Sequence, residues 1–240
     1  QMLNGERSTK DIFQIQNRLA GINHNMLHFL ENHDEQRLAS KFFAGDMWKG
    51  APAMVISATI DKGPVMIFFG QEVGEPGNGA EGFSGDDGRT THFDYWGVPA
   101  HQQWMNEGKF DGGKLNPAQK NLRNFYQKLL NVCLRNEAIR QGHFFDLQYF
   151  NKKNYDTDKV FAFLRYTDKQ KLLVIVNFDT KVKEVKVMIP EKTLEELSLS
   201  ASASTELKDL LSEKSLNFKS ESGANLRLEA LQSYIFEFKN

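Results

Sequence analysis

Two short apolar runs, each followed by polar residues, decide how this 240-residue sequence folds. The first is MLHFL (26–30), followed by ENHD (31–34), and the second is VMIFF (65–69), followed by GQE (70–72). Continuous apolar runs of this length are typical of parallel strands that are buried on both faces. We therefore expect two parallel strands whose carboxyl ends carry polar side chains.

Helical patterns surround these two runs. Ser8 and Asp11 have the spacing of a capping box, and apolar residues follow at positions 12, 15 and 19. A second helix is predicted over 35–44, and a third has Pro52 in its first turn. The strongest helical pattern begins at Asn116 and ends at Gly142. Helices and strands thus alternate over the first 142 residues, which indicates an α/β fold.

The remainder of the chain has a different pattern. Strands are predicted over 160–166, 172–178, 182–189 and 234–238, with another around 226–228, and turns separate them. This pattern favours an antiparallel β-sandwich over 143–240. The glycine-rich segment 74–113 and the small-residue segment 198–205 are predicted to be loops. Because two parallel strands cannot by themselves bury both faces of a sheet, residues 1–142 are expected to form one end of a larger α/β domain.

Composition excludes several classes of protein. Lys and Arg number 30 against 31 Asp and Glu, and this net charge of −1 argues against a nucleic-acid-binding protein. No apolar run approaches the ~20 residues of a membrane span. The single cysteine, Cys133, allows neither an internal disulfide nor a thiolate zinc cluster, and its place on an apolar helical stripe predicts a core thiol.

No cofactor or metal site is expected in this chain. His92 and His101 do not form a metal-binding spacing with Asp94 or Glu107, so a solvated loop is the preferred interpretation. The chain starts at Gln1 without a signal-peptide pattern. We interpret this start as a cut inside a longer polypeptide, so the sequence does not indicate a cellular compartment.

The polar residues after the two apolar runs are the candidate functional residues, and each has a structural alternative. Asp34 either caps a following helix or faces a substrate together with His33. Glu72 either bonds loop backbone or belongs to a site. From the residues alone, both alternatives stay open.

Two segments of the sequence resemble sequence blocks of one enzyme family. The segment FLENHDEQR (29–37) resembles the Asn-His-Asp block that ends the seventh barrel strand in the alpha-amylase family of retaining glycoside hydrolases. The segment GPVMIFFGQE (63–72) resembles the Gly-x-Pro-x-x-Tyr-Tyr-Gly-x-Glu block of the eighth strand, with Phe68 and Phe69 in place of the tyrosines. The resemblance implies the C-terminal portion of a (β/α)8 barrel over 1–142, followed by an antiparallel β-sandwich domain over 143–240.

The resemblance also implies roles for individual residues. Asp34 matches the carboxylate that bonds sugar hydroxyls and stabilises the oxocarbenium-like transition state. His33 matches a histidine that hydrogen-bonds the same sugar. Asn32 matches a residue that braces the loop, and Glu72 matches a mainly structural glutamate.

A looser match lies in DDGRTTHFDYW (86–96), which resembles an Asp-x-x-Arg-x-Pro-Met-x-Trp loop of several family members. Arg89 would then reach the terminal sugar of a bound substrate. The alternative is an ion pair between Arg89 and Asp86, Asp87 or Asp94. The rings of Tyr95 and Trp96 either stack on sugars or, in the preferred interpretation, pack within the loop.

The implied function is retaining cleavage of alpha-glucosidic bonds in starch, glycogen or maltooligosaccharides. Nothing in the sequence matches the family's nucleophile or acid/base blocks, so the chain alone is expected to be inactive. Calcium, if used, would bind in an upstream part. Two alternatives stay open, namely transglycosylation by the same chemistry and a non-catalytic carbohydrate-binding or scaffolding domain. An incomplete barrel should also expose apolar edges, which predicts self-association.

Overall fold

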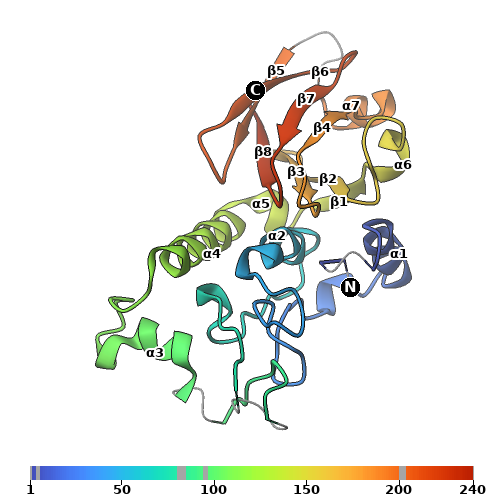
Figure 1. The fold of residues 1–240 in the computed structure, drawn as a ribbon. Coiled ribbons are helices and arrows are strands. Elements are labelled where there is room, and N and C mark those ends of the chain that lie inside the picture. Colours follow the sequence, from blue (N-terminus) through green and yellow to red (C-terminus); the bar gives the residue numbers. More distant parts are fainter. Residues whose placement is uncertain (1, 4–5, 80–84, 94–96, 200–203, 240) are drawn as a thin grey trace.

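The computed structural model describes residues 2–3, 6–79, 85–93, 97–199 and 204–239. Two antiparallel sheets form one end of the molecule, and helices and long loops form the other (Figure 1). The fold class predicted from the sequence, α/β followed by antiparallel β, is confirmed for the described residues.

A six-stranded sheet with the order β1-β2-β3-β8-β5-β6 packs against a two-stranded sheet made of β4 and β7. The strands are β1 (His143–Asp146), β2 (Val160–Tyr166), β3 (Lys171–Asn177), β4 (Lys183–Val187), β5 (Ser204–Asp209), β6 (Ser215–Lys219), β7 (Ala224–Leu228) and β8 (Ser233–Lys239). All strand pairs in both sheets are antiparallel. A core of apolar side chains, including Ile175, Val185 and Phe236, fills the space between the sheets.

The other face of the larger sheet is also buried, which explains why β2 and β3 read as continuous apolar runs. Phe161, Phe163 and Val174 point away from the sandwich core and pack against helices α2 (Ala51–Thr59) and α4 (Pro117–Arg135). The fully buried residues that these helices contribute to this core are Met54, Val55, Leu122 and Leu129. A strand buried on both faces has no polar alternation. The two parts of the chain therefore share one of the two main cores, and the division at residue 142 stays a prediction.

Local sequence signals explain where the main helices begin and end. At α4, Asn116 and Gln119 form a reciprocal capping box, with both bonds at 2.9 Å. The predicted helix to Gly142 is interrupted at Asn136, after which α5 (Glu137–Arg140) begins. In α1 (Lys10–Arg18) the predicted capping box is absent: the Ser8 hydroxyl oxygen accepts from the Lys10 amide at 3.1 Å rather than from the Asp11 amide, and the hydroxyl donates to Asp158 at 2.5 Å.

Arg165 on β2 joins the sheet to the ends of two helices. Its guanidinium is buried and donates to the carbonyl oxygens of Ile60, Ala138 and Ile139 at 3.1, 3.2 and 2.7 Å. The C-terminal carbonyls of a helix lack partners within the helix, so the bonds to Ile60 and Ile139 satisfy carbonyls that would otherwise be buried unpaired. Burial lowers the pKa of Arg165 to about 10. This residue fixes α2, and with it the loops that precede and follow α2.

The two parallel strands expected at 26–30 and 65–69 are reduced to a single parallel bridge between His28 and Val65. The His28 amide donates to the Pro64 carbonyl, and the Met66 amide donates to the His28 carbonyl, both at 2.8 Å. Within the described residues no further strand lies beside this pair, and no closed barrel forms. A parallel pair without neighbours has few hydrogen bonds to hold it, which accounts for its short extent.

The helix predicted over 35–44 is wrong, since the described residues of this segment form turns. The Arg37 amide donates to the carbonyl of Gly88 at 2.7 Å rather than to a carbonyl four residues earlier. The Ser40 carbonyl accepts from the amides of Phe43 and Gly45. Contacts to a distant loop thus replace the helical ladder, and Asp34 caps no helix.

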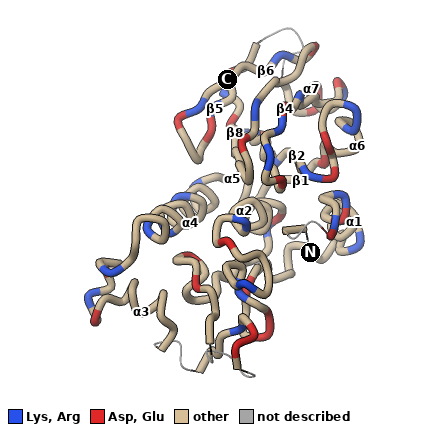
Figure 2. Tube along the Cα trace, viewed as in Figure 1, with Lys and Arg blue, Asp and Glu red and all other residues tan. Residues whose placement is uncertain are grey.

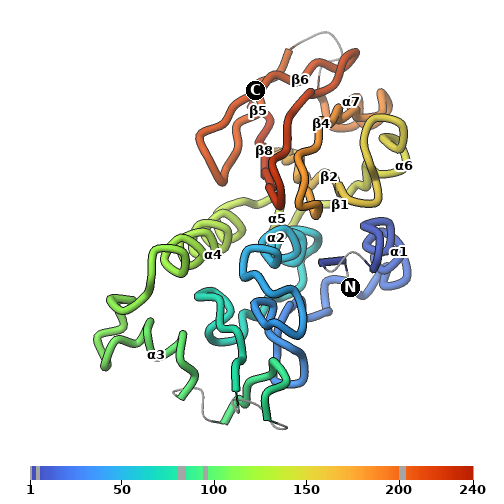
Figure 3. The backbone as a smooth tube through the Cα atoms, in the orientation of Figure 1, coloured from blue at the N-terminus to red at the C-terminus, as the bar shows by residue number. Residues whose placement is uncertain are grey.

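The remaining elements are short. They are the helices α3 (Pro99–Met105), α6 (Gln148–Asn151) and α7 (Glu191–Glu196), and 3₁₀ turns at Asn23–Asn25, Met47–Gly50, Gln71–Val73 and Asn106–Gly108. The predicted loop 74–113 is thus interrupted by α3. Acidic and basic positions are interspersed along the chain (Figure 2). The segments around residues 40 and 87 lie together at the end of the molecule opposite the sheets (Figure 3).

Candidate functional site

The turn after the first apolar segment places His33 and Asp34 on the surface. The Asn32 side-chain oxygen accepts hydrogen bonds from the amides of Asp34 and Glu35, each at 2.9 Å. An asparagine that bonds backbone two and three residues ahead fixes a turn locally. This contact agrees with the predicted bracing role of Asn32.

A buried ion pair anchors this turn from below. Arg37 is fully buried, and its guanidinium donates to the Glu31 carboxylate at 2.8 Å, the Thr90 hydroxyl at 2.9 Å and the Phe69 carbonyl at 2.9 Å. Its cationic carbon also lies 4.3 Å from the centroid of the Phe68 ring. One side chain therefore ties together the ends of both apolar segments and the loop at residue 90.

Glu31 is buried to the same degree as its partner. Its second oxygen accepts from the Leu38 amide at 2.6 Å, so both carboxylate oxygens have donors. Burial raises the pKa of Glu31, and Arg37 opposes that shift. A charge this deep is tolerated only because it is paired and hydrogen-bonded.

The loop 85–90 packs directly on this turn. Gly88 has a φ of +83°, and a Cβ atom there would lie 2.2 Å from the Ser40 hydroxyl oxygen. Only glycine combines this left-handed backbone with so close an approach. Lys41 and Asp86 form an exposed ion pair at 2.5 Å across the same contact. The loop is therefore held against the segment that carries His33 and Asp34.

Arg89 is held by its near neighbour Asp87. Its Nε and Nη2 atoms donate to one Asp87 oxygen at 2.9 and 2.6 Å, and its amide donates to the other at 3.0 Å. This bond to Asp87 raises the pKa of Arg89, and the charge of Asp34 adds to the shift in the same direction. The ion-pair alternative for Arg89 is thus realised with Asp87.

The structure places His33 beside Asp34, and the loop that carries Arg89 packs against Arg37 of the same segment. The His33 Nε2 atom lies 3.6 Å from an Asp34 carboxylate oxygen, and the His33 ring packs edge-on against the ring of His92, with centroids 4.4 Å apart. The side chain of Asp34 is 71% exposed and that of His33 is 39% exposed. An exposed carboxylate beside an imidazole can accept hydroxyl hydrogen bonds and attract positive charge.

The glutamate that bonds loop backbone is Glu75, which sequence reasoning missed. Its two oxygens accept from the amides of Gly77 and Ala100, each at 2.9 Å, and the residue is almost fully buried. Glu72 is only half-buried and lines a hollow of about 490 Å³ that also includes His101, Trp104 and Arg123. The buried roles of Glu31, Arg37 and Glu75 had no signal in the sequence beyond their charge, which ordinarily predicts exposure.

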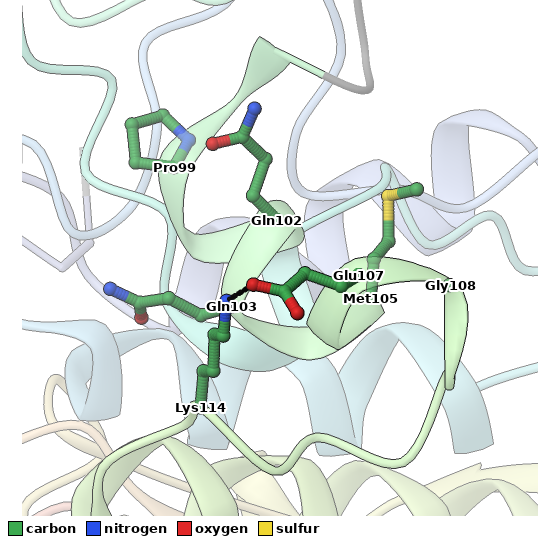
Figure 4. Close-up of a pocket in the computed structure, with 7 residues that line it drawn as sticks. All are labelled: Pro99, Gln102, Gln103, Met105, Glu107, Gly108 and Lys114. Carbon is green, nitrogen blue, oxygen red and sulfur yellow. Dashed lines mark hydrogen bonds and ion pairs between the residues drawn. The ribbon is translucent and has the colours of Figure 1, made fainter.

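Other surface features lie apart from these residues. A hollow of about 520 Å³ beside α3 is crossed by an exposed ion pair between Lys114 and Glu107 at 2.5 Å (Figure 4). In the described parts of the chain, no three His, Cys, Asp or Glu side chains are placed to hold a metal ion. Among the same residues, no helix has the length and apolarity needed to cross a membrane. Asp94, Tyr95 and Trp96 lie outside the described residues.

Comparison with solved structures identifies the fold. The chain is similar to an Anoxybacillus alpha-amylase (TM-score 0.68, 17% identity), of which it covers 44% with 99% of its own length. It is also similar to a maltogenic alpha-amylase from Thermotoga neapolitana (TM-score 0.65, 15% identity, 100% of this chain and 48% of that one). An isomaltulose synthase from Erwinia rhapontici gives a TM-score of 0.59 at 20% identity, over 98% of this chain and 47% of that one.

At these identities the likeness concerns the fold, which is that of alpha-amylase structures over nearly the whole chain. The chain spans less than half the length of each of these three proteins. No protein-family model matches the sequence.

Proposed function

We propose that this chain carries part of the substrate site of an enzyme that acts on alpha-glucosidic bonds with retention of configuration. In this proposal Asp34 accepts hydroxyl hydrogen bonds from the sugar at the cleavage point and stabilises its positively charged transition state. His33 donates to the same sugar, and Arg89 reaches the terminal sugar. Transglycosylation uses the same intermediate with a sugar in place of water, so it is the second candidate reaction at this site.

The observation that carries the proposal is that one buried side chain, Arg37, contacts both the turn with His33 and Asp34 and the distant loop with Arg89. The buried pair of Arg37 and Glu31 holds the turn that presents His33 and Asp34, and Arg37 also bonds Thr90, next to Arg89. A carbohydrate site needs rigidly held polar groups that converge on one point. The alpha-amylase fold and the two sequence blocks support the same assignment.

We propose further that the chain is inactive alone. Retaining cleavage requires a nucleophile and an acid/base about 5 Å apart, and neither block has a match in the sequence. The exposure of Asp34 supports this, since a carboxylate in water stabilises a nearby positive charge far less than one in a closed site. The roles proposed for His33, Asp34 and Arg89 require no metal ion.

Binding and activity measurements on the purified chain test these proposals. Maltotriose should shift the amide NMR signals around residues 33, 34 and 89, and Asp34→Ala should abolish those shifts without changing the melting temperature. Lys41→Ala is the matched control for Arg89→Ala, because each breaks one ion pair on the same loop. Equal binding by wild type, Asp34→Ala and Arg89→Ala would refute the site. Release of reducing sugar from maltotriose by the wild-type chain would refute the inactivity.

We also propose that the chain self-associates through the edge around residues 22–29. Ile22, Met26, Leu27 and Phe29 are between 37% and 50% exposed. Contiguous apolar surface beside a strand edge favours association. Light scattering after size exclusion should give a mass that rises with protein concentration, and Leu27→Lys should return it to the monomer value. A concentration-independent monomer for the wild type would contradict the proposal.

A further inference from the structure

Asn78 and Gly79 form an exposed asparagine–glycine pair in the loop that follows the Gln71–Val73 turn. The preceding residue, Gly77, is buried, and its amide donates to the Glu75 carboxylate at 2.9 Å. The Asn78 side chain has no hydrogen-bond partner among the residues that the structure describes. Gly79 has a φ of +71°, and a Cβ atom built on it would meet nothing within 4 Å. The pair is therefore anchored on one side and unobstructed at its own side-chain position.

An asparagine that is followed by glycine can react with its own backbone. The amide nitrogen of the following residue attacks the side-chain carbonyl carbon, the bond from that carbon to the side-chain nitrogen breaks, and ammonia leaves with the proton that the backbone nitrogen gave up to solvent. Water then opens the cyclic succinimide to aspartate or isoaspartate. A side chain on the following residue hinders the attack, and glycine has none. The reacting atoms must approach to about 3–3.5 Å, which a side chain without fixed bonds can reach by rotation.

Two aspartate–glycine pairs, at 87–88 and 111–112, also have glycine as the following residue but are held differently. The first carboxylate accepts bonds from Arg89, and the second accepts from the Asn106 side chain at 2.7 Å. These bonds lower the pKa of both carboxyls, so both are charged at neutral pH. A charged carboxylate held in one position resists attack by a nitrogen nucleophile. Neither pair should therefore compete with Asn78.

Asp86 contacts the nitrogen atom that would attack. The Gly79 amide donates to one Asp86 oxygen at 3.0 Å, and the Lys41 ammonium donates to the other at 2.5 Å. The bond from Lys41 lowers the pKa of Asp86, so this carboxylate is charged at neutral pH. The attack requires the amide to lose its proton, and a negative charge that accepts a bond from that proton disfavours the loss. Asp86 should therefore slow the reaction at Asn78.

We propose that Asn78 is a deamidation site of the folded chain, where the side-chain amide is converted through a succinimide to aspartate and isoaspartate at a rate that Asp86 restrains. The reaction needs no reactant other than water. The product carries a new negative charge close to Asp86. In the isoaspartate form the side-chain methylene enters the backbone, which moves the Gly79 amide relative to Asp86. The proposal does not depend on the function proposed above.

The test incubates the 240-residue chain in mildly alkaline buffer and follows it by peptide mapping with mass spectrometry. Trypsin releases the segment 63–89, in which Asn78 is the only asparagine. This segment should gain the mass of an amide-to-acid conversion, with isoaspartate as the more abundant product. Asn78→Gln should abolish the change, because glutamine would have to form a larger ring. A folded chain whose segment stays unchanged long after the same chain in urea has converted would overturn the proposal, as would aspartate without isoaspartate.

A matched pair of variants tests the role of Asp86. Asp86→Ala and Lys41→Ala each break the same exposed ion pair, but only the first removes the charge beside the Gly79 amide. Asp86→Ala should deamidate about three- to tenfold faster than wild type, since one pKa unit at the amide is about a factor of ten. Lys41→Ala, at the same melting temperature, should be no faster. Equal acceleration of both variants would assign the restraint to loop mobility and overturn the role of the carboxylate, and so would acceleration of neither.

Discussion

Replacing Arg37 with methionine should destabilise the fold more than most single substitutions in this chain. The change removes three side-chain hydrogen bonds, to Glu31, Thr90 and the Phe69 carbonyl, and leaves the Glu31 carboxylate 2% exposed without a cation. Breaking a buried ion pair by removing one partner costs about 3–5 kcal/mol, because the remaining charge is uncompensated. The total stability of a domain is only about 5–15 kcal/mol, so a loss of this size is easily measured.

The pH dependence of that loss identifies its cause. Burial already raises the pKa of Glu31 with Arg37 present, and Arg37→Met removes the group that opposes the shift. A carboxyl whose folded pKa lies above its unfolded value costs stability progressively as the pH rises from the unfolded pKa to the folded pKa, and that cost disappears as the pH falls back to the unfolded value. The loss should therefore be larger at pH 7.5 than at pH 5.

Urea unfolding followed by far-UV circular dichroism at both pH values measures the effect. The control is the double substitution Glu31→Gln/Arg37→Met, which removes both charges and should recover most of the lost stability. The reasoning fails if the single variant loses less than about 1 kcal/mol at pH 7.5, or if the double variant is no more stable than the single one.

Three further predictions concern other parts of the chain. Because burial raises the pKa of Asp146 from 3.8 to about 6, the folded protein loses stability as pH rises through that range. After a discount for partial exposure, Asp146→Asn should be about 1–2 kcal/mol more stable than wild type at pH 7.5 and equal to it below pH 4, as thermal melts at each pH will test. Gly88→Ala should cost about 1–3 kcal/mol and weaken maltotriose binding, since its Cβ meets the Ser40 hydroxyl and its φ is +83°; unchanged urea unfolding would contradict the strain argument. Burial raises the pKa of the Cys133 thiol to about 12, so a disulfide reagent should label it slowly in the native chain and rapidly in urea, and equal rates would show the thiol to be accessible.

The sequence predicted the strands whose apolar pattern is strong and missed those that depend on tertiary context. The runs that became β2 and β3 were recognised because both faces of these strands are buried. The strand β5 was missed, since its sequence STELKD is mostly polar and is held by pairing with β6 and β8. The helix expected over 35–44 has apolar residues at helical spacing, such as Leu38 and Phe42, but contacts of Arg37 and Ser40 with the loop 85–90 determine the path of this segment instead.

The candidate site was predictable only in its surface residues. The pattern around His33 and Asp34 marked them as candidates, and the structure places their side chains 3.6 Å apart on the surface. Arg37 and Glu31 hold them in place, but both are charged residues, which a sequence ordinarily predicts to be exposed. Their burial depends on Phe68, Phe69 and Thr90, which are far away in sequence, so no local pattern could reveal it.

The core that α2 and α4 form with one face of the larger sheet has a consequence for any attempt to separate the two parts of this chain. A recombinant piece beginning at His143 would present Phe161, Phe163, Val174 and Ile235 to water, because α2 and α4 would be gone. Such a piece would aggregate or need detergent, whereas the intact chain should melt as one cooperative unit in calorimetry. The Arg165 guanidinium would lose its three carbonyl partners and would lie as an unpaired cation on this exposed apolar face.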